Sequence, residues 1–308
     1  MRRTTVIAAL GLALLGSAPA QADEAAGHYN LALQYKREGK TAAAIGECET
    51  AVKLRPDYAA AHFTLGNLYR GQGDYARAAG EYEKTVKLQP KDADAHANLG
   101  AAYTRLKRSD EGIRELETAL DLKPDDYEAR LSLGVAYKQT GDYKHAIEHL
   151  QKATELKPDD PKGWTNLGVA KSKSDDKEGA IVALKKAIAL KPDDAELHFD
   201  LGAVYRRQRN TDAAISEYQV AILKNPKMAK AYYDMGVMYS LGRKNPEAQA
   251  AFEKFLEYGP HEDPGARKDA EERLKTIKGQ STPSGSTTTP PSTTTPPATA
   301  GGKAAHAK

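Results

Sequence analysis

Apolar residues recur along this chain at two spacings, one short and one long. Within each short stretch they stand three or four positions apart, which is the spacing of one face of an α-helix. At the longer spacing, every interval between seven prolines is 34 residues: Pro56, Pro90, Pro124, Pro158, Pro192, Pro226 and Pro260. A fixed period of this length indicates an array of repeated units that bury their apolar faces against their neighbours.

When the repeats are numbered so that each proline stands at position 32, other positions also hold the same type of residue from repeat to repeat. Position 7 is leucine or methionine throughout, and position 8 is glycine in every unit except the first. Position 11 is tyrosine except in the fifth unit, and position 20 is alanine except in the third. The seven units run without a gap: 25–58, 59–92, 93–126, 127–160, 161–194, 195–228 and 229–262.

These columns predict two helices in each unit. Positions 7, 8 and 11 share one face of a first helix, and positions 20, 24 and 27 share one face of a second. Small residues at positions 8 and 20 would let the two helices approach closely, which offsets the cost of up to about 1 kcal/mol for a glycine inside a helix. The proline ends the second helix because the residue before a proline avoids the α region.

The pattern resembles the tetratricopeptide-repeat family over residues 25–262. The large residue of the family at position 4 is His28, His62, His96, Arg130, Trp164, His198 and Tyr232 here, and we interpret the histidines as stacking residues. The resemblance implies an all-α fold, a right-handed α-solenoid of seven helical hairpins whose first helices line a concave groove. The fifth unit departs with Lys171 at position 11 and a polar turn, so we expect it to be the loosest.

Residues 1–22 have the pattern of a secretory signal peptide. Arg2 and Arg3 precede an apolar run from Val6 to Leu15 and then small residues, with cleavage expected after Ala22 or after Ala20. The run is about half of the roughly 20 apolar residues that cross a bilayer. The signal has a bacterial form, so we expect an exported protein in the periplasm or the medium.

Two segments follow the repeats. Residues 266–278 predict a capping helix, because one side of it would carry Ala266, Ala270, Leu274 and Ile277. Residues 279–308 are almost entirely threonine, proline, serine, glycine and alanine. Such a segment buries too little apolar surface to order itself, so we expect a disordered tail.

Composition limits the partners. The net charge of +3 falls further when Arg2 and Arg3 are removed, so nothing favours nucleic acid or an anionic membrane. Cys48 is the only cysteine, which excludes an intramolecular disulfide. It stands at position 24 of its unit, where we expect a small buried side chain.

One short segment resembles a catalytic motif. His145, Glu148 and His149 match the inverted zinc-protease pattern. Ile147 and Leu150 should point into the core, which leaves two solvated histidines without a third ligand. We therefore expect no enzyme activity, no metal and no cofactor.

The groove is the expected binding site. Asparagine amides can bind the backbone of an extended peptide, aromatic rings can hold its side chains, and cations would favour acidic sequences. The alternative is that the cations only complement helix dipoles and the polar residues only solvate the groove. The candidate groove residues are Tyr29, Phe63, Asn67, Arg70, Asn98, Arg105, Leu131, Lys138, Asn166, Phe199, Arg206 and Tyr233.

The clamp that this family uses for a C-terminal carboxylate is not predicted. Asn67 and Asn98 match its two asparagines, but Phe63, Glu128 and Ser132 stand where its basic residues belong. We expect a scaffold that binds proteins or peptide segments for a cell-envelope assembly, with pilus, secretion, motility and outer-membrane biogenesis all open. The alternatives are an accessory or regulatory subunit of an envelope enzyme, and a secreted spacer without a specific ligand.

Overall fold

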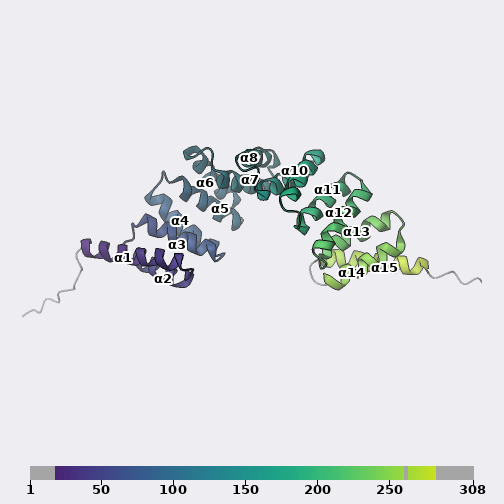
Figure 1. The fold of residues 1–308 in the computed structure, drawn as a ribbon, viewed down its shortest axis with the longest axis horizontal. Coiled ribbons are helices and arrows are strands. Elements are labelled where there is room, and N and C mark those ends of the chain that lie inside the picture. The colour runs from purple at the N-terminus through teal and green to yellow at the C-terminus, as the bar shows by residue number, and fades with distance from the viewer. Residues whose placement is uncertain (1–17, 260–262, 282–308) are drawn as a thin grey trace, which may run out of the picture. The chain divides into compact units, whose positions relative to one another are not determined.

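The computed structural model describes residues 18–259 and 263–281, and all regular structure within these ranges is helical (Figure 1). Most of the predicted signal peptide and nearly all of the predicted tail lie outside the described residues. The first helices of the repeats are α1 (Ala18–Arg37), α3 (Ala59–Gly71), α5 (Ala93–Arg105), α7 (Tyr127–Thr140), α9 (Pro161–Lys173), α11 (Ala195–Arg207) and α13 (Ala229–Leu241).

The second helices alternate with the first. They are α2 (Thr41–Leu54), α4 (Tyr75–Leu88), α6 (Ser109–Leu122), α8 (Tyr143–Leu156), α10 (Lys177–Leu190), α12 (Thr211–Lys224) and α14 (Asn245–Tyr258). A last helix, α15 (Pro264–Ser281), covers the segment predicted to be a cap. Helix α1 begins at Ala18, so both predicted cleavage positions fall within its first turns.

The chain divides into two compact units, with the boundary inside α13. Unit 1 comprises residues 1–231 and unit 2 comprises residues 232–308. In unit 1, each first helix packs against the second helix of its own hairpin, and each second helix packs against the next first helix. The successive first helices α5, α7, α9 and α11 also contact one another. The predicted all-α solenoid of helical hairpins is confirmed.

Each hairpin depends on a close approach between its two helices. A Cβ atom added to Gly66 would lie 2.7 Å from the ring of Tyr82, which stands at position 24 of the same repeat. Among the glycines at position 8, the closest approach to a backbone oxygen of the partner helix lies between α5 and α6. There a Cβ atom on Gly100 would lie 2.6 Å from Leu116 Cγ and 2.8 Å from the carbonyl oxygen of Gly112.

The first repeat solves the same packing problem with smaller partners. Position 8 is Ala32 and position 24 is Cys48, and both side chains lie fully buried in one core cluster. A small residue at position 24 leaves room for the methyl group at position 8. Burial raises the pKa of the Cys48 thiol to about 12, so the thiol stays protonated at neutral pH.

Side chains at position 4 tie each repeat to the one before it. The ring nitrogens His62 Nε2 and Trp164 Nε1 lie 2.9 and 2.8 Å from the carbonyl oxygens of Pro56 and Pro158. Arg130 Nε donates to the carbonyl oxygen of Pro124 at 3.0 Å. These carbonyl groups lie two residues beyond the end of the preceding second helix, so the donors fix the turn that leads into the next repeat. His62, His96 and His198, which we expected to be stacking residues, thus contact the preceding repeat through hydrogen bonds.

All four histidines at position 4 also bind a glutamate. Nδ1 lies 2.6 Å from Glu81 in the case of His62 and 2.6 Å from Glu115 in the case of His96. The second repeat therefore holds a nearly buried His62–Glu81 pair between its two helices.

Tyrosines at position 11 link neighbouring repeats at three junctions. Their hydroxyl groups donate to a glutamate of the preceding repeat, in the pairs Tyr69–Glu49, Tyr103–Glu83 and Tyr137–Glu117. At the next junction Lys171 replaces the tyrosine and instead pairs with Asp176 of its own repeat, at 3.1 Å. That substitution removes the hydroxyl–carboxylate link before the fifth repeat.

We predict that Gly100→Ala and Gly46→Ala shift stability in opposite directions. The methyl group on Gly100 would overlap a backbone oxygen that cannot move alone, so a loss of roughly 1–3 kcal/mol is expected. Gly46 lies exposed in α2 with nothing within 4 Å of the added atom, so alanine should gain up to about 1 kcal/mol through helix propensity. Urea denaturation followed by circular dichroism measures both changes. An unchanged midpoint for Gly100→Ala would contradict the close approach.

Candidate peptide-binding groove

A cavity of about 720 Å³ opens along the first helices of four consecutive repeats in unit 1. Helices α3, α5, α7 and α9 supply nearly all of its walls, because successive first helices lie side by side. The cavity is lined by Arg70, Tyr75, Ala101, Ala102, Thr104, Arg105, Glu128, Leu131, Ser132, Val135, Lys138, Gln139, Lys162 and Asn166.

The cavity is basic and has an apolar part. Its four cationic side chains are Arg70, Arg105, Lys138 and Lys162, and its one acidic side chain is Glu128. The apolar part comprises Ala101, Ala102, Leu131 and Val135. A surface of this kind can hold apolar side chains while its rim attracts carboxylates.

Cations of the cavity lack acidic partners. Within the described ranges, Arg70, Arg105 and Lys138 take part in no ion pair. Away from the groove, Arg108 pairs with Glu111 at 2.6 Å and Lys123 pairs with Asp126 at 2.9 Å. No ion pair within the described residues neutralises the charges of Arg70, Arg105 and Lys138.

Lys138 is the most enclosed of these cations. Its ammonium group donates to Asn166 Oδ1 at 2.7 Å, from α7 to α9. Asn166 is held in turn, because its amide nitrogen donates to the carbonyl oxygen of Lys162 at 2.9 Å. Burial lowers the pKa of Lys138, which means that its surroundings supply too little negative charge for the ammonium form.

Five of the residues predicted for the groove come together at this cavity: Arg70, Arg105, Leu131, Lys138 and Asn166. Glu128 and Lys162, which both stand at position 2 of their repeats, also line the cavity but were not among the predicted groove residues. Position 2 lies one turn before position 6 on the same helix face, so helical spacing alone could have identified both residues.

Four other predicted groove residues serve the packing of unit 1. Asn67 accepts a hydrogen bond from the hydroxyl of Tyr82 at 2.9 Å. Phe63 packs against the same Tyr82 ring, and Tyr29 packs against the ring of Tyr58, with centroids 5.9 and 5.0 Å apart. Phe199 packs against Tyr218 with centroids 5.6 Å apart.

Two further predicted groove residues, Asn98 on α5 and Arg206 on α11, do not line the cavity. Asn98 donates its amide hydrogen to the carbonyl oxygen of Asp94, at 2.8 Å within the same helix. Arg206 is exposed near the end of α11.

Asp200, on α11, is a charged residue that the sequence analysis did not single out as a binding residue. It stands at position 6, the same position as Asn166 in the repeat before it. Burial raises the pKa of Asp200 to about 6, against the lowering effect of Lys230 and Lys138. Lys138 and Asp200 influence each other electrostatically without forming an ion pair.

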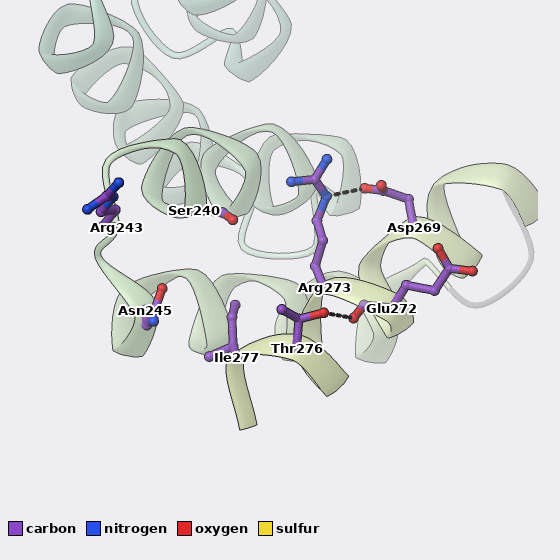
Figure 2. A pocket seen from close by; sticks show the side chains of 8 residues that line it. All are labelled: Ser240, Arg243, Asn245, Asp269, Glu272, Arg273, Thr276 and Ile277. Atoms are coloured by element: carbon purple, nitrogen blue, oxygen red, sulfur yellow. Dashed lines mark hydrogen bonds and ion pairs between the residues drawn. The ribbon is translucent and has the colours of Figure 1, made fainter. Parts of the chain in front are cut away.

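Unit 2 contains a separate cavity of about 680 Å³, where α15 meets α13 and α14 (Figure 2). Its charges balance, because Arg243, Arg273, Asp269 and Glu272 all belong to its lining. Arg273 Nε lies 2.6 Å from the Asp269 carboxylate, as Figure 2 shows. Tyr233, the last predicted groove residue, donates to the same carboxylate at 2.9 Å and thus holds α15.

The segment that matches a zinc-protease pattern, with His145, Glu148 and His149, makes structural contacts. His145 Nδ1 lies 2.6 Å from Asp142 Oδ2, and the His149 ring stacks on Tyr137 with centroids 5.7 Å apart. The Nδ1 atom of His149 is buried without a hydrogen-bond partner, so the expectation of two solvated histidines is wrong for this residue. Across the described residues, no three histidine, cysteine or acidic side chains group as a metal site. None of the described helices is long and apolar enough to cross a bilayer.

Tandem helical hairpins with a lined groove define a helical-repeat protein. The family model described as the Cilia and flagella-associated protein 70 C-terminal domain, a tetratricopeptide-repeat model, matches residues 6–271. The chain therefore belongs to this family of tetratricopeptide-repeat proteins, and the predicted repeat family is confirmed. No curated protein matches the chain in sequence.

Solved structures share the fold. The Cut9–Hcn1 hetero-tetramer of the APC/C contains a chain that is 23% identical, with a TM-score of 0.58 over 75% of this chain and 45% of that one, so the present chain spans less than half of it. YrrB, described as a TPR protein with an unusual peptide-binding site, is 21% identical, with a TM-score of 0.52 over 62% and 97%. A tetratricopeptide-repeat protein from Parabacteroides merdae is 17% identical, with a TM-score of 0.61 over 83% and 99%.

We predict that Asp200→Asn stabilises the protein at pH 8 and has little effect near pH 4. A carboxyl group with a raised pKa prefers to fold protonated, so folding loses stability as pH rises from about 4 to about 6. Above about pH 6 the ionised, buried carboxylate destabilises the folded protein by at most roughly 3 kcal/mol, as expected for a pKa shift of this size. Asparagine carries no charge at any pH and avoids the cost.

Urea denaturation midpoints at the two pH values measure this difference. Asp212→Asn, an exposed aspartate on α12, is the matched control and should leave both midpoints nearly unchanged. An equal effect of Asp200→Asn at both pH values would show that the carboxylate is not desolvated.

Proposed function

We propose that the protein is an exported scaffold that holds extended, acidic peptide segments of partner proteins in the groove of unit 1. The observation that carries the proposal is the basic cavity across α3, α5, α7 and α9, whose cations have no acidic partner of their own. An incoming carboxylate would form charge-assisted hydrogen bonds there, which are about twice as strong as neutral ones.

The shape of the cavity favours an extended segment. It follows four first helices in succession, so a ligand must reach across several repeats to contact all of the cations. The apolar residues Leu131 and Val135 would take apolar side chains between the acidic ones. The likeness of the fold to YrrB, which has a peptide-binding site of its own, supports a peptide as the ligand class.

The setting of this binding is a cell-envelope assembly in a bacterium. The support for this part is the signal-peptide pattern of residues 1–22, with its two arginines and its short apolar run. A scaffold outside the cytoplasm would serve multi-protein assemblies such as pili, secretion machines, motility devices or outer-membrane biogenesis.

We predict that Lys138→Met weakens the binding of an acidic peptide at least tenfold. The probe is a fluorescein-labelled 12-residue peptide of alternating glutamate and leucine, and fluorescence anisotropy at low salt reports its affinity. Loss of one charge-assisted contact of about 1.5–3 kcal/mol corresponds to a fall of tenfold or more. Salt at about 0.5 M should weaken wild-type binding as well, because it screens exposed charges.

Lys152→Met is the matched control for this experiment. Lys152 belongs to the same repeat but lies exposed on α8, where it pairs with Glu148 at 3.3 Å. A second peptide, with lysine in place of each glutamate, tests the sign of the charge and should not bind. Equal binding of both peptides, or equal loss in both variants, would exclude the basic cavity as the site.

We predict that the protein isolated from a periplasmic fraction begins at Asp23, or at Gln21 if cleavage follows Ala20. Intact mass spectrometry distinguishes the two products from the full chain. Leu14→Arg interrupts the apolar run and should leave the precursor uncleaved in the cytoplasm. A wild-type protein that keeps Met1 and stays in the cytoplasm would refute the export proposal.

A further inference from the structure

Asp200 stands at position 6 of its repeat on α11, the position at which Asn166 lines the cavity from α9. Its carboxylate is partly buried on α11, and no described residue donates a hydrogen bond to it or pairs with it. Taking a carboxylate out of water without a partner costs free energy, which a donor from a ligand would return. The surroundings of Asp200 therefore favour a bound donor.

The two nearest cations are already engaged elsewhere. Lys138 donates to Asn166, and Lys230 pairs with Glu196 while its ammonium group lies 4.3 Å from the centroid of the Phe199 ring. Both cations influence Asp200 through space, although neither bonds it. Of the nearby acidic groups, Asp194 pairs with Lys191 at 2.7 Å. Asp200 is thus the acidic group in this neighbourhood that remains available.

Three successive first helices arrange these groups in order. Lys138 comes from α7, Asn166 from α9 and Asp200 from α11, with the Lys138–Asn166 hydrogen bond at one side. Beyond the cations of α3, α5, α7 and α9, the next first helix places the carboxylate of Asp200 at the repeat position that Asn166 holds on α9. A ligand that extends past Lys138 toward α11 meets an acidic group.

We propose that Asp200 forms a second subsite of the groove, which binds a lysine or arginine side chain of the ligand at a fixed distance from its acidic stretch. This inference rests on the proposed function, because the acidic stretch occupies the basic cavity. An ammonium or guanidinium group supplies a charge-assisted hydrogen bond to a carboxylate and neutralises it at the same time. Asp200 thereby selects the register of the bound peptide.

The raised pKa of Asp200 agrees with this assignment. Burial without a donor is its main cause, and a bound cation would lower the pKa again by favouring the carboxylate form. The lysine of the ligand should therefore contribute more at pH 7.5 than at pH 5, where the carboxyl group is largely protonated.

The test uses the purified full chain and two sets of labelled synthetic peptides. Each peptide has three consecutive glutamates, a serine–glycine spacer of two to eight residues and one lysine, placed before the glutamates in one set and after them in the other. In control peptides of the same length, norleucine replaces the lysine. The difference in affinity between the two peptides measures the contribution of the lysine charge. We expect one spacing at which lysine improves wild-type affinity at least tenfold, and a much smaller gain at other spacings.

Asp200→Asn should reduce that gain to less than twofold and leave the affinity for the norleucine peptides unchanged. Asp212→Asn, a control on α12 of the same repeat, should keep the full gain. Asp200→Glu retains the charge and should keep part of it. Circular dichroism confirms that each variant is folded.

The outcomes separate the two proposals. Binding of the glutamate peptides that depends on Lys138 but shows no lysine effect at any spacing would overturn the Asp200 subsite and leave the basic groove standing. A lysine gain that survives in Asp200→Asn would also overturn the subsite. Failure of every glutamate peptide to bind the wild-type protein would overturn the groove itself, and the subsite with it.

Discussion

The close contact between the two helices of each hairpin is the constraint on which the rest of the structure depends. At Gly100 the space is so small that even a methyl group would meet Leu116 and a backbone oxygen. Van der Waals packing at this distance fixes how the two helices cross, and the same crossing recurs because the same small residues recur. A repeated crossing stacks the hairpins in one way, and that stacking sets the first helices of unit 1 side by side.

The groove is a consequence of this stacking. Residues 34 positions apart reach equivalent places on neighbouring helices, so single residues per repeat add up to a continuous surface. At position 12 this brings Arg70 and Lys138 to one cavity, while Thr104 between them turns inward and bonds the carbonyl oxygen of Gly100. Binding chemistry can thus vary from repeat to repeat without any change in the packing that holds the array together.

The turns between helices show how far local sequence reasoning reaches. Position 15 adopts a left-handed backbone in all seven repeats, with glycine at Gly39, Gly73 and Gly141. Glycine favours a turn at this position, because it adopts this conformation without strain. Lys107, Asp175, Arg209 and Arg243 take the same conformation at the equivalent positions. The side chains of these four residues do not indicate a left-handed backbone. The packing of the flanking helices imposes that conformation.

The sequence by itself determined the repeat, the helices, the family and which positions face the core, since these follow from helical periodicity and from small residues repeated seven times. It also indicated five residues of the basic cavity. Only the tertiary structure decided that Lys138 bonds Asn166, 28 residues away, and that Asp200 has no hydrogen-bond donor. It also decided that Asn67 and Phe63 contact Tyr82. Those outcomes depend on which side chains meet across neighbouring helices, and a linear pattern does not contain the distances between them.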